Sequence, residues 1–266
     1  MGFYCCQVKI LYGKIPGGFN MHRFYVEENQ IQKDEIVITG EDVNHIKNVL
    51  RMKIGDEIII CNGQGKDFYS IIRQISSDKV ITDVISKKDT DTELPNQIYL
   101  FQGLPTKDKM ELIIQKAVEL GVYEIIPVVT KRSIVKLDEK KKELKKLARW
   151  QGISTSAAKQ SGRGIIPRVT NVMTYHEAID KAKNLDYNII PYEKEEDIDR
   201  TKELIKGVKG KKSIGIFIGP EGGFEESEIR TALQEDVKPI TLGKRILRTE
   251  TAGLAILSII MFELEG

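Results

Sequence analysis

A glycine-rich segment follows an apolar run in the C-terminal third of the chain. The sequence GPEGG (219–223) stands between the run SIGIFI (213–218) and an expected helix over 226–234. Glycines after a strand let the backbone approach a ligand closely, and the N-terminus of the next helix offers unpaired N–H groups. The same pattern fits a plain tight turn. Taken alone, it therefore predicts either a ligand-binding loop or a turn.

A second segment, LGKRILRTETAG (242–253), leads into the last expected helix. Three cations and one carboxylate surround the apolar pair Ile246 and Leu247, and Thr251 is expected to cap the helix. The alternative is a solvated charged loop. The apolar pair favours a loop that is partly buried and partly presented to a ligand.

A third cluster combines Arg149 and Trp150 with the segment AAKQSGR that ends at Arg163. Arginine and tryptophan side chains can contact phosphates and stack on bases. The alternative for a single tryptophan is a packing role in the core. The cluster is thus a candidate for nucleic-acid contact, with packing as the simpler interpretation.

Several classes of chemistry are disfavoured. Neither the dinucleotide-binding glycine pattern nor the P-loop occurs, and the three cysteines and three histidines lack metal-ligand spacing. The apolar stretch 254–262 is shorter than the ~20 residues of a membrane helix. The net charge of +2 argues against a binder that acts by bulk charge. Residues 105–168, however, hold 15 Lys and Arg against 7 Asp and Glu, which favours a local face for a polyanion.

The N-terminal region is dominated by short strands. Gly-, Asn- and Ser-containing turns separate them, and one helix is expected over 41–52. This pattern predicts a small β-barrel-like domain. A polar segment, 87–95, ends in Pro95 and is expected to be a linker. The expected strands are 22–26, 35–39, 57–61, 68–75 and 79–86.

After this linker the pattern alternates between strands and helices, which predicts a mainly parallel sheet with helices on both faces. The expected strands are 97–102, 123–129, 188–191, 213–218 and 239–242. The expected helices are 109–120, 138–161 with a possible break at Gly152, 175–184 opened by a capping box, 226–234 and 252–264.

The first twenty residues contain no acidic side chain and two of the three cysteines. They lack the apolar core and small-residue cleavage site of a signal peptide. Residues 17–21 can be encoded by a purine-rich ribosome-binding sequence, a spacer and a start codon. We expect Met21 to be the natural start and 1–20 to be translated leader; a genuine mobile tail is the alternative.

Four segments together resemble one known family, the RsmE-type 16S rRNA (uracil-N3)-methyltransferases of the SPOUT superfamily. They are LPTKDKMELIIQKAVELGV, AKQSGR, IGPEGGF and LGKRILRTETAG, and the resemblance covers about residues 21–266. One departure is Glu225, where the family is expected to carry a Ser or Thr cap. The resemblance implies an α/β fold: a trefoil-knotted SPOUT domain over 91–266, preceded by a PUA-like RNA-binding barrel over 21–90.

The resemblance further implies S-adenosyl-L-methionine as cofactor, no metal, a homodimer, a cytoplasmic location, and the 16S rRNA of the small ribosomal subunit as substrate. The last helix offers Leu254, Ile256, Ile259 and Ile260 either to a dimer interface or to the core. The implied cofactor-binding residues are Pro191, Ile218, Gly219, Gly223, Leu242, Gly243, Ile246 and Leu247.

Methylation of uracil N3 requires positioning and removal of the N3 proton. Glu221, Glu250 or water could take that proton, and Arg163 and Arg248 are the candidate cations. The alternative for Glu250 is an ion pair that orients Arg248. The expected RNA-binding residues are Arg23, Arg51, Lys53, Lys107, Arg132 and Arg149.

Two other functions compete with this interpretation. One is a SPOUT enzyme that methylates a ribose 2′-hydroxyl or another base. The other is a non-catalytic RNA-binding assembly protein.

Overall fold

A computed structural model describes residues 21–106, 108–133 and 140–265. The expected leader 1–20 and the expected RNA contact Lys107 lie outside these residues. The chain divides into two compact units. The first consists mainly of residues up to 87, and the second of residues from 88 onward together with two short pieces, 25–27 and 61–67.

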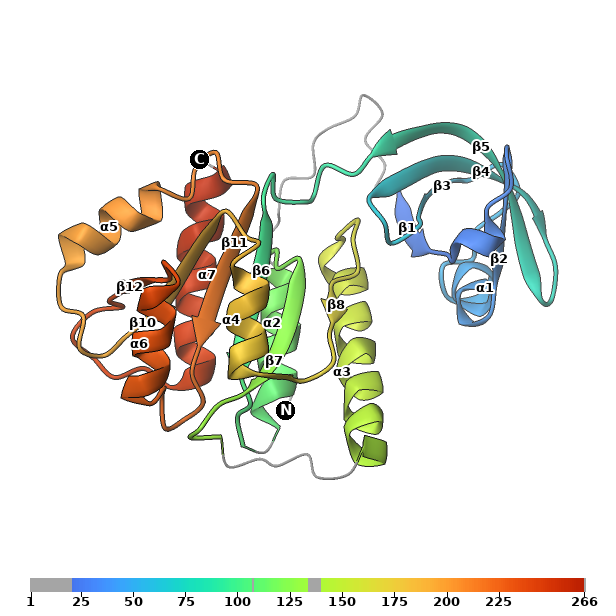
Figure 1. The fold of residues 1–266 in the computed structure, drawn as a ribbon. Helices are drawn as coiled ribbons and strands as arrows, with labels where there is room; N and C mark the ends of the chain where they lie inside the picture. Colours follow the sequence, from blue (N-terminus) through green and yellow to red (C-terminus); the bar gives the residue numbers. More distant parts are fainter. Residues whose placement is uncertain (1–20, 107, 134–139, 266) are drawn as a thin grey trace, which may run out of the picture. The chain divides into compact units, whose positions relative to one another are not determined.

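The first unit is built on a five-stranded sheet with the order β1-β3-β4-β5-β2 (Figure 1). Alternating apolar residues give this sheet one buried face, on which Ile36, Ile58 and Ile72 are fully buried. The expected helix 41–52 is instead a short α1 (Glu41–Asn44) followed by a π-helical turn (His45–Val49). The strands are β1 (His22–Tyr25), β2 (Glu35–Thr39), β3 (Glu57–Cys61), β4 (Lys66–Ile75) and β5 (Lys79–Asp89), and Glu28–Gln30 form a 3₁₀ turn.

The second unit is built on a parallel sheet with the order β12-β10-β11-β6-β7-β8, and β9 also pairs with β7. This confirms the predicted α/β fold. Its two shortest strands, β8 and β9, were not expected from the sequence. The strands are β6 (Gln97–Gly103), β7 (Glu124–Val129), β8 (Arg168–Val169), β9 (Met173–Thr174), β10 (Tyr187–Pro191), β11 (Ser213–Ile218) and β12 (Lys238–Ile240).

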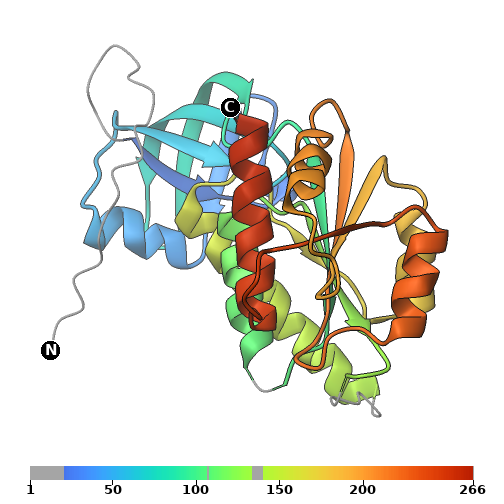
Figure 2. The same ribbon diagram turned by 90° about the vertical axis from the view of Figure 1, so that its left-hand side faces the viewer.

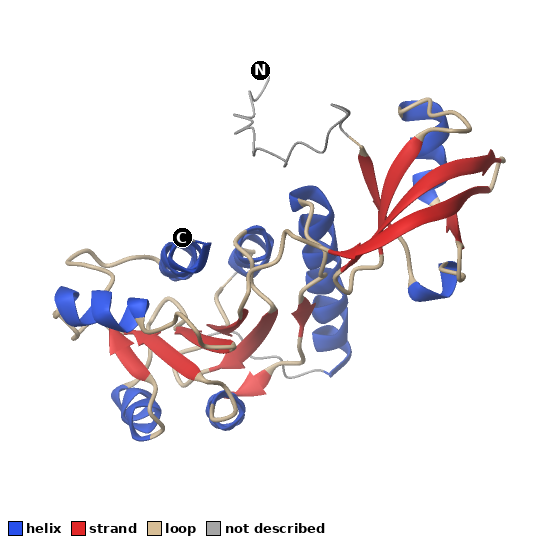
Figure 3. Cartoon of the chain, turned by 90° about the horizontal axis from the view of Figure 1, so that it is seen from above, coloured by secondary structure: helices blue, strands red, loops and turns tan. Residues whose placement is uncertain are grey.

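Helices cover both faces of this sheet, as predicted (Figure 3). One face carries α2 (Lys109–Glu119), α3 (Lys140–Ser161), α5 (Ile198–Lys206) and α7 (Thr249–Glu265). The other carries α4 (Tyr175–Ala182) and α6 (Glu226–Gln234), over a core that includes the stacked rings of Phe101 and Phe217, with centroids 4.4 Å apart. Because parallel strands are apolar on both faces, each layer of helices has its own buried cluster.

Three local expectations were wrong, and one helix was not predicted. Helix α3 continues through Gly152, since a single glycine in a long helix costs only about 1 kcal/mol. Helix α7 begins at Thr249, so Thr251 lies inside it and does not cap it. Strand β5 runs to Asp89, which shortens the expected linker, and α5 was not predicted at all.

Trp150 is only 7% exposed and belongs to the core beneath α2 and α3, so it packs and does not present its ring for base stacking. Helix α6 begins normally despite Glu225, because Glu228 Oε2 accepts a 2.8 Å hydrogen bond from the Glu225 backbone N–H.

The strand register brings the carboxyl ends of four strands to one edge of the sheet. Ile218 is paired with Gln102 in β6, and Pro191 at the end of β10 is paired with Ile240 in β12. After β12 the chain crosses to the first turn of α7 (Figure 2). Ligands of open α/β sheets bind beyond this edge, so a site is expected at the loops after β6, β10, β11 and β12.

Candidate functional site

A buried hydrogen-bond network joins β6, the GPEGG loop and the start of α7. Gln102 Nε2 donates to Thr249 Oγ1 at 2.9 Å and to the Gly103 carbonyl oxygen at 2.9 Å. Thr249 Oγ1 in turn donates to the Gly219 carbonyl oxygen at 2.6 Å. The two glycine-rich segments identified in the sequence are therefore held against each other.

Two glycines allow this close approach. A Cβ atom on Gly103 would lie 2.6 Å from Pro220 Cδ, and one on Gly219 would lie 3.1 Å from the backbone of Gly223. Gly223 has a φ of 67°, in the region that favours glycine. The loop after β11 is thus folded back on itself and pressed against β6, and its residues Glu221 and Gly222 are exposed.

A charged cluster, the Lys109 cluster, lies beside this loop and consists of Thr106, Lys109, Glu221 and Glu250. The Glu221 carboxylate accepts from the Thr106 backbone N–H at 3.0 Å and from Thr106 Oγ1 at 2.7 Å. Lys109 Nζ lies 3.0 Å from Glu221 Oε1 and 3.5 Å from Glu250 Oε2. Glu250 therefore pairs with Lys109, whereas the alternative considered from the sequence was an ion pair with Arg248. Lys109 and Thr106 were not predicted as site residues, because they lie in the segment LPTKDKM (104–110) and carry no spacing signal of their own.

The pKa of Glu221 is unusually low. Burial by itself would raise it, but the hydrogen bonds from Thr106 and Lys109 outweigh burial and lower the pKa from 4.5 to about 2. The hydrogen bond to Glu221 raises the pKa of Lys109. Glu221 therefore stays ionised at any physiological pH, with its oxygens already engaged, which makes it a weak proton acceptor.

The loop between β12 and α7 presents an apolar side chain to the outside. Ile246 is 96% exposed, whereas Leu242 and Leu247 are half-buried and Arg248 is exposed. Gly243 has a φ of 98° and its N–H donates to Thr241 Oγ1 at 3.2 Å. Ile246 is three residues before Thr249, which bonds to the GPEGG loop, and its exposed side chain is available to an apolar group of a ligand.

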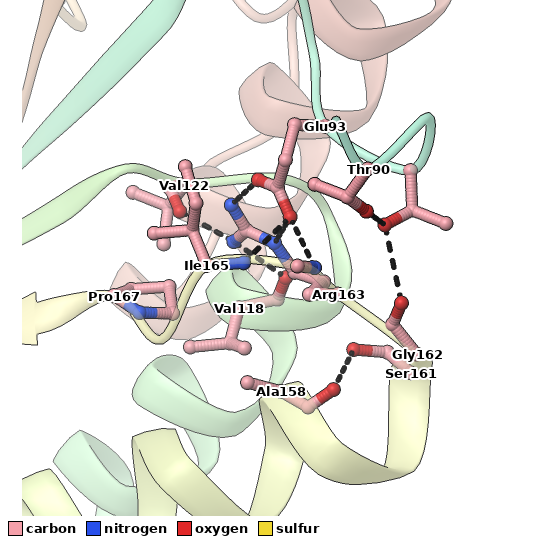
Figure 4. A network of polar contacts seen from close by, with 12 residues as sticks. Thr90, Glu93, Val118, Val122, Ala158, Ser161, Gly162, Arg163, Ile165 and Pro167 are labelled. Carbon is pink, nitrogen blue, oxygen red and sulfur yellow. Dashed lines mark hydrogen bonds and ion pairs between the residues drawn. The ribbon is translucent and has the colours of Figure 1, made fainter. Parts of the chain in front are cut away.

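Arg163 occupies a different place from the other expected catalytic residues. Its guanidinium forms an ion pair with Glu93, whose Oε1 also accepts from the backbone N–H groups of Gly164 at 2.8 Å and Ile165 at 3.1 Å (Figure 4). The side chains are 5% and 15% exposed.

The remaining donors of Arg163 are engaged as well, since its Nη1 donates to the carbonyl oxygens of Val118 and Val122 at the end of α2. The guanidinium is thus buried and engaged by Glu93, Val118 and Val122, an arrangement that favours a structural anchor over the predicted catalytic role. Glu93 was missed because it lies in a polar stretch that looked like a linker.

The expected RNA-binding residues are dispersed. Arg132 Nη1 donates to the Gly222 carbonyl oxygen at 2.8 Å, which places it at the GPEGG loop. Arg149 pairs with Glu111 at 2.8 Å on the α2–α3 face. Arg23, Arg51 and Lys53 belong to the first unit.

In the described part of the chain, no three His, Cys, Asp or Glu side chains are grouped so as to hold a metal ion. No helix there is both long enough and apolar enough to cross a membrane.

Comparisons with known proteins agree on one family. A family model described as RNA methyltransferase domain matches residues 92–261, and one described as RNA methyltransferase PUA domain matches residues 38–85. A Bacillus subtilis protein named ribosomal RNA small subunit methyltransferase E is 39% identical over 92% of this chain and 98% of its own length. A protein of the same name from Mesomycoplasma hyopneumoniae is 36% identical over 90% of this chain and 98% of its own.

A solved structure points the same way. The ribosomal RNA small subunit methyltransferase E of Neisseria gonorrhoeae, bound to S-adenosyl methionine, is 35% identical and covers 91% of this chain and 97% of its own, with a TM-score of 0.74. The α/β unit, the PUA-domain match and the two assembled loops are all consistent with these relatives. The chain therefore belongs to the ribosomal RNA small subunit methyltransferase E family of RNA methyltransferases.

Proposed function

We propose that this protein transfers a methyl group from S-adenosyl-L-methionine to N3 of a uridine in the 16S rRNA of the small ribosomal subunit. One observation carries the proposal: in a member of this family, the Thr249–Gly219 hydrogen bond assembles the GPEGG and RILRTETAG loops at the carboxyl edge of the sheet. That edge is where α/β proteins bind their ligands.

The residues at this edge fit such a cofactor. Glycines without a Cβ leave backbone groups accessible, and the exposed Ile246 offers an apolar surface for an adenine ring. When bound, the cofactor supplies a methyl group activated on a sulfonium. The residues proposed to hold it are Pro191, Ile218, Gly219, Gly223, Leu242, Gly243, Ile246 and Leu247.

The chain's own contribution to the reaction is positioning and charge. Alignment of two bound reactants can lower the barrier by about 7–11 kcal/mol. Arg248 is exposed beside Glu250 at the start of α7, so it can face the developing charge on the uracil oxygens. Glu221 and Glu250 are the carboxylates proposed to act at the site, whereas Arg163, buried against Glu93, is proposed as a structural anchor.

The RNA-binding surface is proposed to include Arg132, which lies at the GPEGG loop, and Arg149 on the basic stretch. Arg23, Arg51 and Lys53 are proposed as contacts of the PUA-like unit, with the boundary between the units near residue 90. Reading of an unpaired or extruded nucleotide is typical of enzymes that modify a base.

Two finer features of the architecture are also proposals. Helix α7 packs on α2 and bonds to Gln102, although β12 lies beyond β10 and β11 at the far edge. The chain after β12 must therefore return across the ends of two strands, which supports a trefoil knot.

A homodimer is supported by the outer face of α7, where Ile259 is 45% and Phe262 is 77% exposed, while Ile256 and Ile260 are buried in the core. A cytoplasmic location is proposed from the substrate.

The test is a product assay on purified small ribosomal subunits and on naked 16S rRNA, with the nucleosides separated by mass spectrometry. N3-methyluridine that appears only with enzyme and S-adenosyl-L-methionine supports the proposal. A 2′-O-methylated nucleoside would identify the rival SPOUT activity. Failure to bind the cofactor by calorimetry would revive the non-catalytic assembly protein.

A further inference from the structure

The two carboxylates of the Lys109 cluster differ in how completely they are satisfied. Glu221 Oε1 receives the Thr106 N–H, the Thr106 hydroxyl and Lys109 Nζ. Glu250 Oε2 is buried and receives no hydrogen bond among the described residues, and Lys109 Nζ lies 3.5 Å from it. Glu221 is thus surrounded by donors, whereas Glu250 has one oxygen that receives no hydrogen bond and a side chain that remains 16% exposed.

An unsatisfied buried carboxylate oxygen is costly unless a partner arrives with a ligand. Glu250 is the second residue of α7, next to the Thr249 that ties the helix to the GPEGG loop. It is therefore fixed at the loops proposed to hold the cofactor. A ligand that approaches there with an N–H group would complete its hydrogen bonding.

Lys109 is the residue that links the two carboxylates. It is the first residue of α2, where a cation is disfavoured by the helix dipole. Two carboxylates around a half-buried ammonium offset that cost, and they also determine where the ammonium lies. The Lys109 ammonium in turn orients the Glu250 carboxylate.

We propose that Glu250 is the catalytic residue that accepts the uracil N3 proton, and that Lys109 is the positioning residue that orients Glu250 while Glu221 braces Lys109. This deepens the proposed function and rests on it. The division of roles between Glu221 and Glu250 is one that the motifs alone leave open.

The proton transfer is balanced without a further reactant. The N3–H bond of the uracil breaks, its proton goes to the Glu250 carboxylate, whose side chain is 16% exposed, and the electron pair stays on N3, which becomes the nucleophile. A neutral uracil and the Glu250 carboxylate thus become a uracil anion and a neutral carboxyl group, which later releases its proton to water. Arg248, in the loop just before α7, is the cation proposed to stabilise the anion.

The experiment compares Glu250→Gln, Glu221→Gln, Lys109→Met and Lys109→Arg in the full-length protein. Lys116→Met is the matched control, because Lys116 is on the same helix and pairs with its helix neighbour Glu119 at 2.8 Å. For each variant we measure kcat and KM on small subunits, cofactor affinity by calorimetry and the melting temperature. Glu250→Gln is expected to lower kcat by about 10²–10⁴-fold, the range of general-base catalysis, with cofactor Kd changed less than about threefold.

Lys109→Met is expected to lower kcat with little change in KM, and Lys109→Arg to recover most of the loss. The double variant Lys109→Met/Glu250→Gln is expected to be no slower than Glu250→Gln alone, because Lys109 acts through Glu250. Glu221→Gln is expected to lower the melting temperature and to reduce kcat less than Glu250→Gln. Lys116→Met retains wild-type kcat.

Several outcomes overturn the assignment: wild-type kcat in Glu250→Gln, a larger kcat loss in Glu221→Gln, or multiplicative losses in the double variant. Lys109 would have a purely structural role if Lys109→Met lowers both kcat and the melting temperature and Lys109→Arg does not restore kcat. If the wild-type protein forms no N3-methyluridine, the proposed function itself fails, which is a separate result from an unaffected Glu250→Gln variant.

Discussion

The Thr249 hydroxyl donates a 2.6 Å hydrogen bond to the carbonyl oxygen of Gly219, although the two residues are 30 positions apart in the chain. The same hydroxyl accepts from the buried Gln102 amide. The Thr249 side chain thereby joins three parts of the fold. Gln102 lies in β6, Gly219 follows β11, and Thr249 itself opens the helix after β12. The shape of the site depends on this junction.

Replacing Thr249 by Val removes both hydrogen bonds while keeping the side-chain volume. We expect the free energy of unfolding to fall by about 1–3 kcal/mol, since the Gln102 amide and the Gly219 carbonyl lose a partner. Cofactor affinity is expected to fall as well, because the loop is no longer held. Denaturant unfolding and calorimetry measure the two effects. Thr249→Ser is the control and should retain both properties; equal behaviour of the Val and Ser variants would contradict the prediction.

Alanine at Gly103 and at Gly152 should have opposite effects on stability. A Cβ on Gly103 would lie 2.6 Å from Pro220 Cδ and 2.7 Å from its backbone nitrogen, so the GPEGG loop must move. We expect lower stability and weaker cofactor binding. At Gly152, in an exposed part of α3, no atom lies within 4 Å of a new Cβ.

Gly152→Ala should therefore stabilise the protein by about 0.5–1 kcal/mol through helix propensity. Thermal unfolding of the two variants side by side checks the pair. A Gly103→Ala variant as stable as the wild type would show that the two loops are less closely packed than described.

Removing one partner of the Arg163–Glu93 pair should be strongly destabilising. Arg163→Met leaves Glu93 with fewer donors in a nearly dry environment, and losing one partner of a buried ion pair costs about 3–5 kcal/mol. The double variant Arg163→Met/Glu93→Gln should lose less than the sum of the two single variants. A double-mutant cycle by denaturant unfolding measures this coupling. Full stability with lost turnover in Arg163→Met would restore the catalytic role.

Acid should weaken the contribution of Glu221 to folding. Its folded-state pKa is about 2, below the ordinary value of 4.5, so its stabilising effect is fully present above the ordinary pKa and is lost as the pH falls toward about 2. The difference in unfolding free energy between wild type and Glu221→Gln should be constant near neutral pH and shrink below about pH 4.5. Denaturant unfolding over this pH range tests it, and a difference that grows on acidification would contradict it.

Most helices and strands could be predicted from the sequence because their signals are local. The run SIGIFI before GPEGG became β11 over the expected residues, and the capping box at Thr174 opens α4. The wrong predictions concern segments whose local sequence signals are weak or are overridden by tertiary packing. Helix α3 continues through Gly152 because its buried face continues, and β8 and β9, of two residues each, are too short to show a period.

The amino-acid sequence by itself determined the alternation of strands and helices and the two glycine-rich loops, since hydrophobic period and turn residues act over a few positions. Only the tertiary structure decided which charged groups meet. Lys109, Glu221 and Glu250 come from three separate segments, and Arg163 and Glu93 are 70 positions apart. Such pairings depend on the spatial order of the parallel strands in the sheet, and no local sequence pattern encodes that order. The buried Arg163 therefore resembled a site residue in the sequence, whereas Lys109 did not.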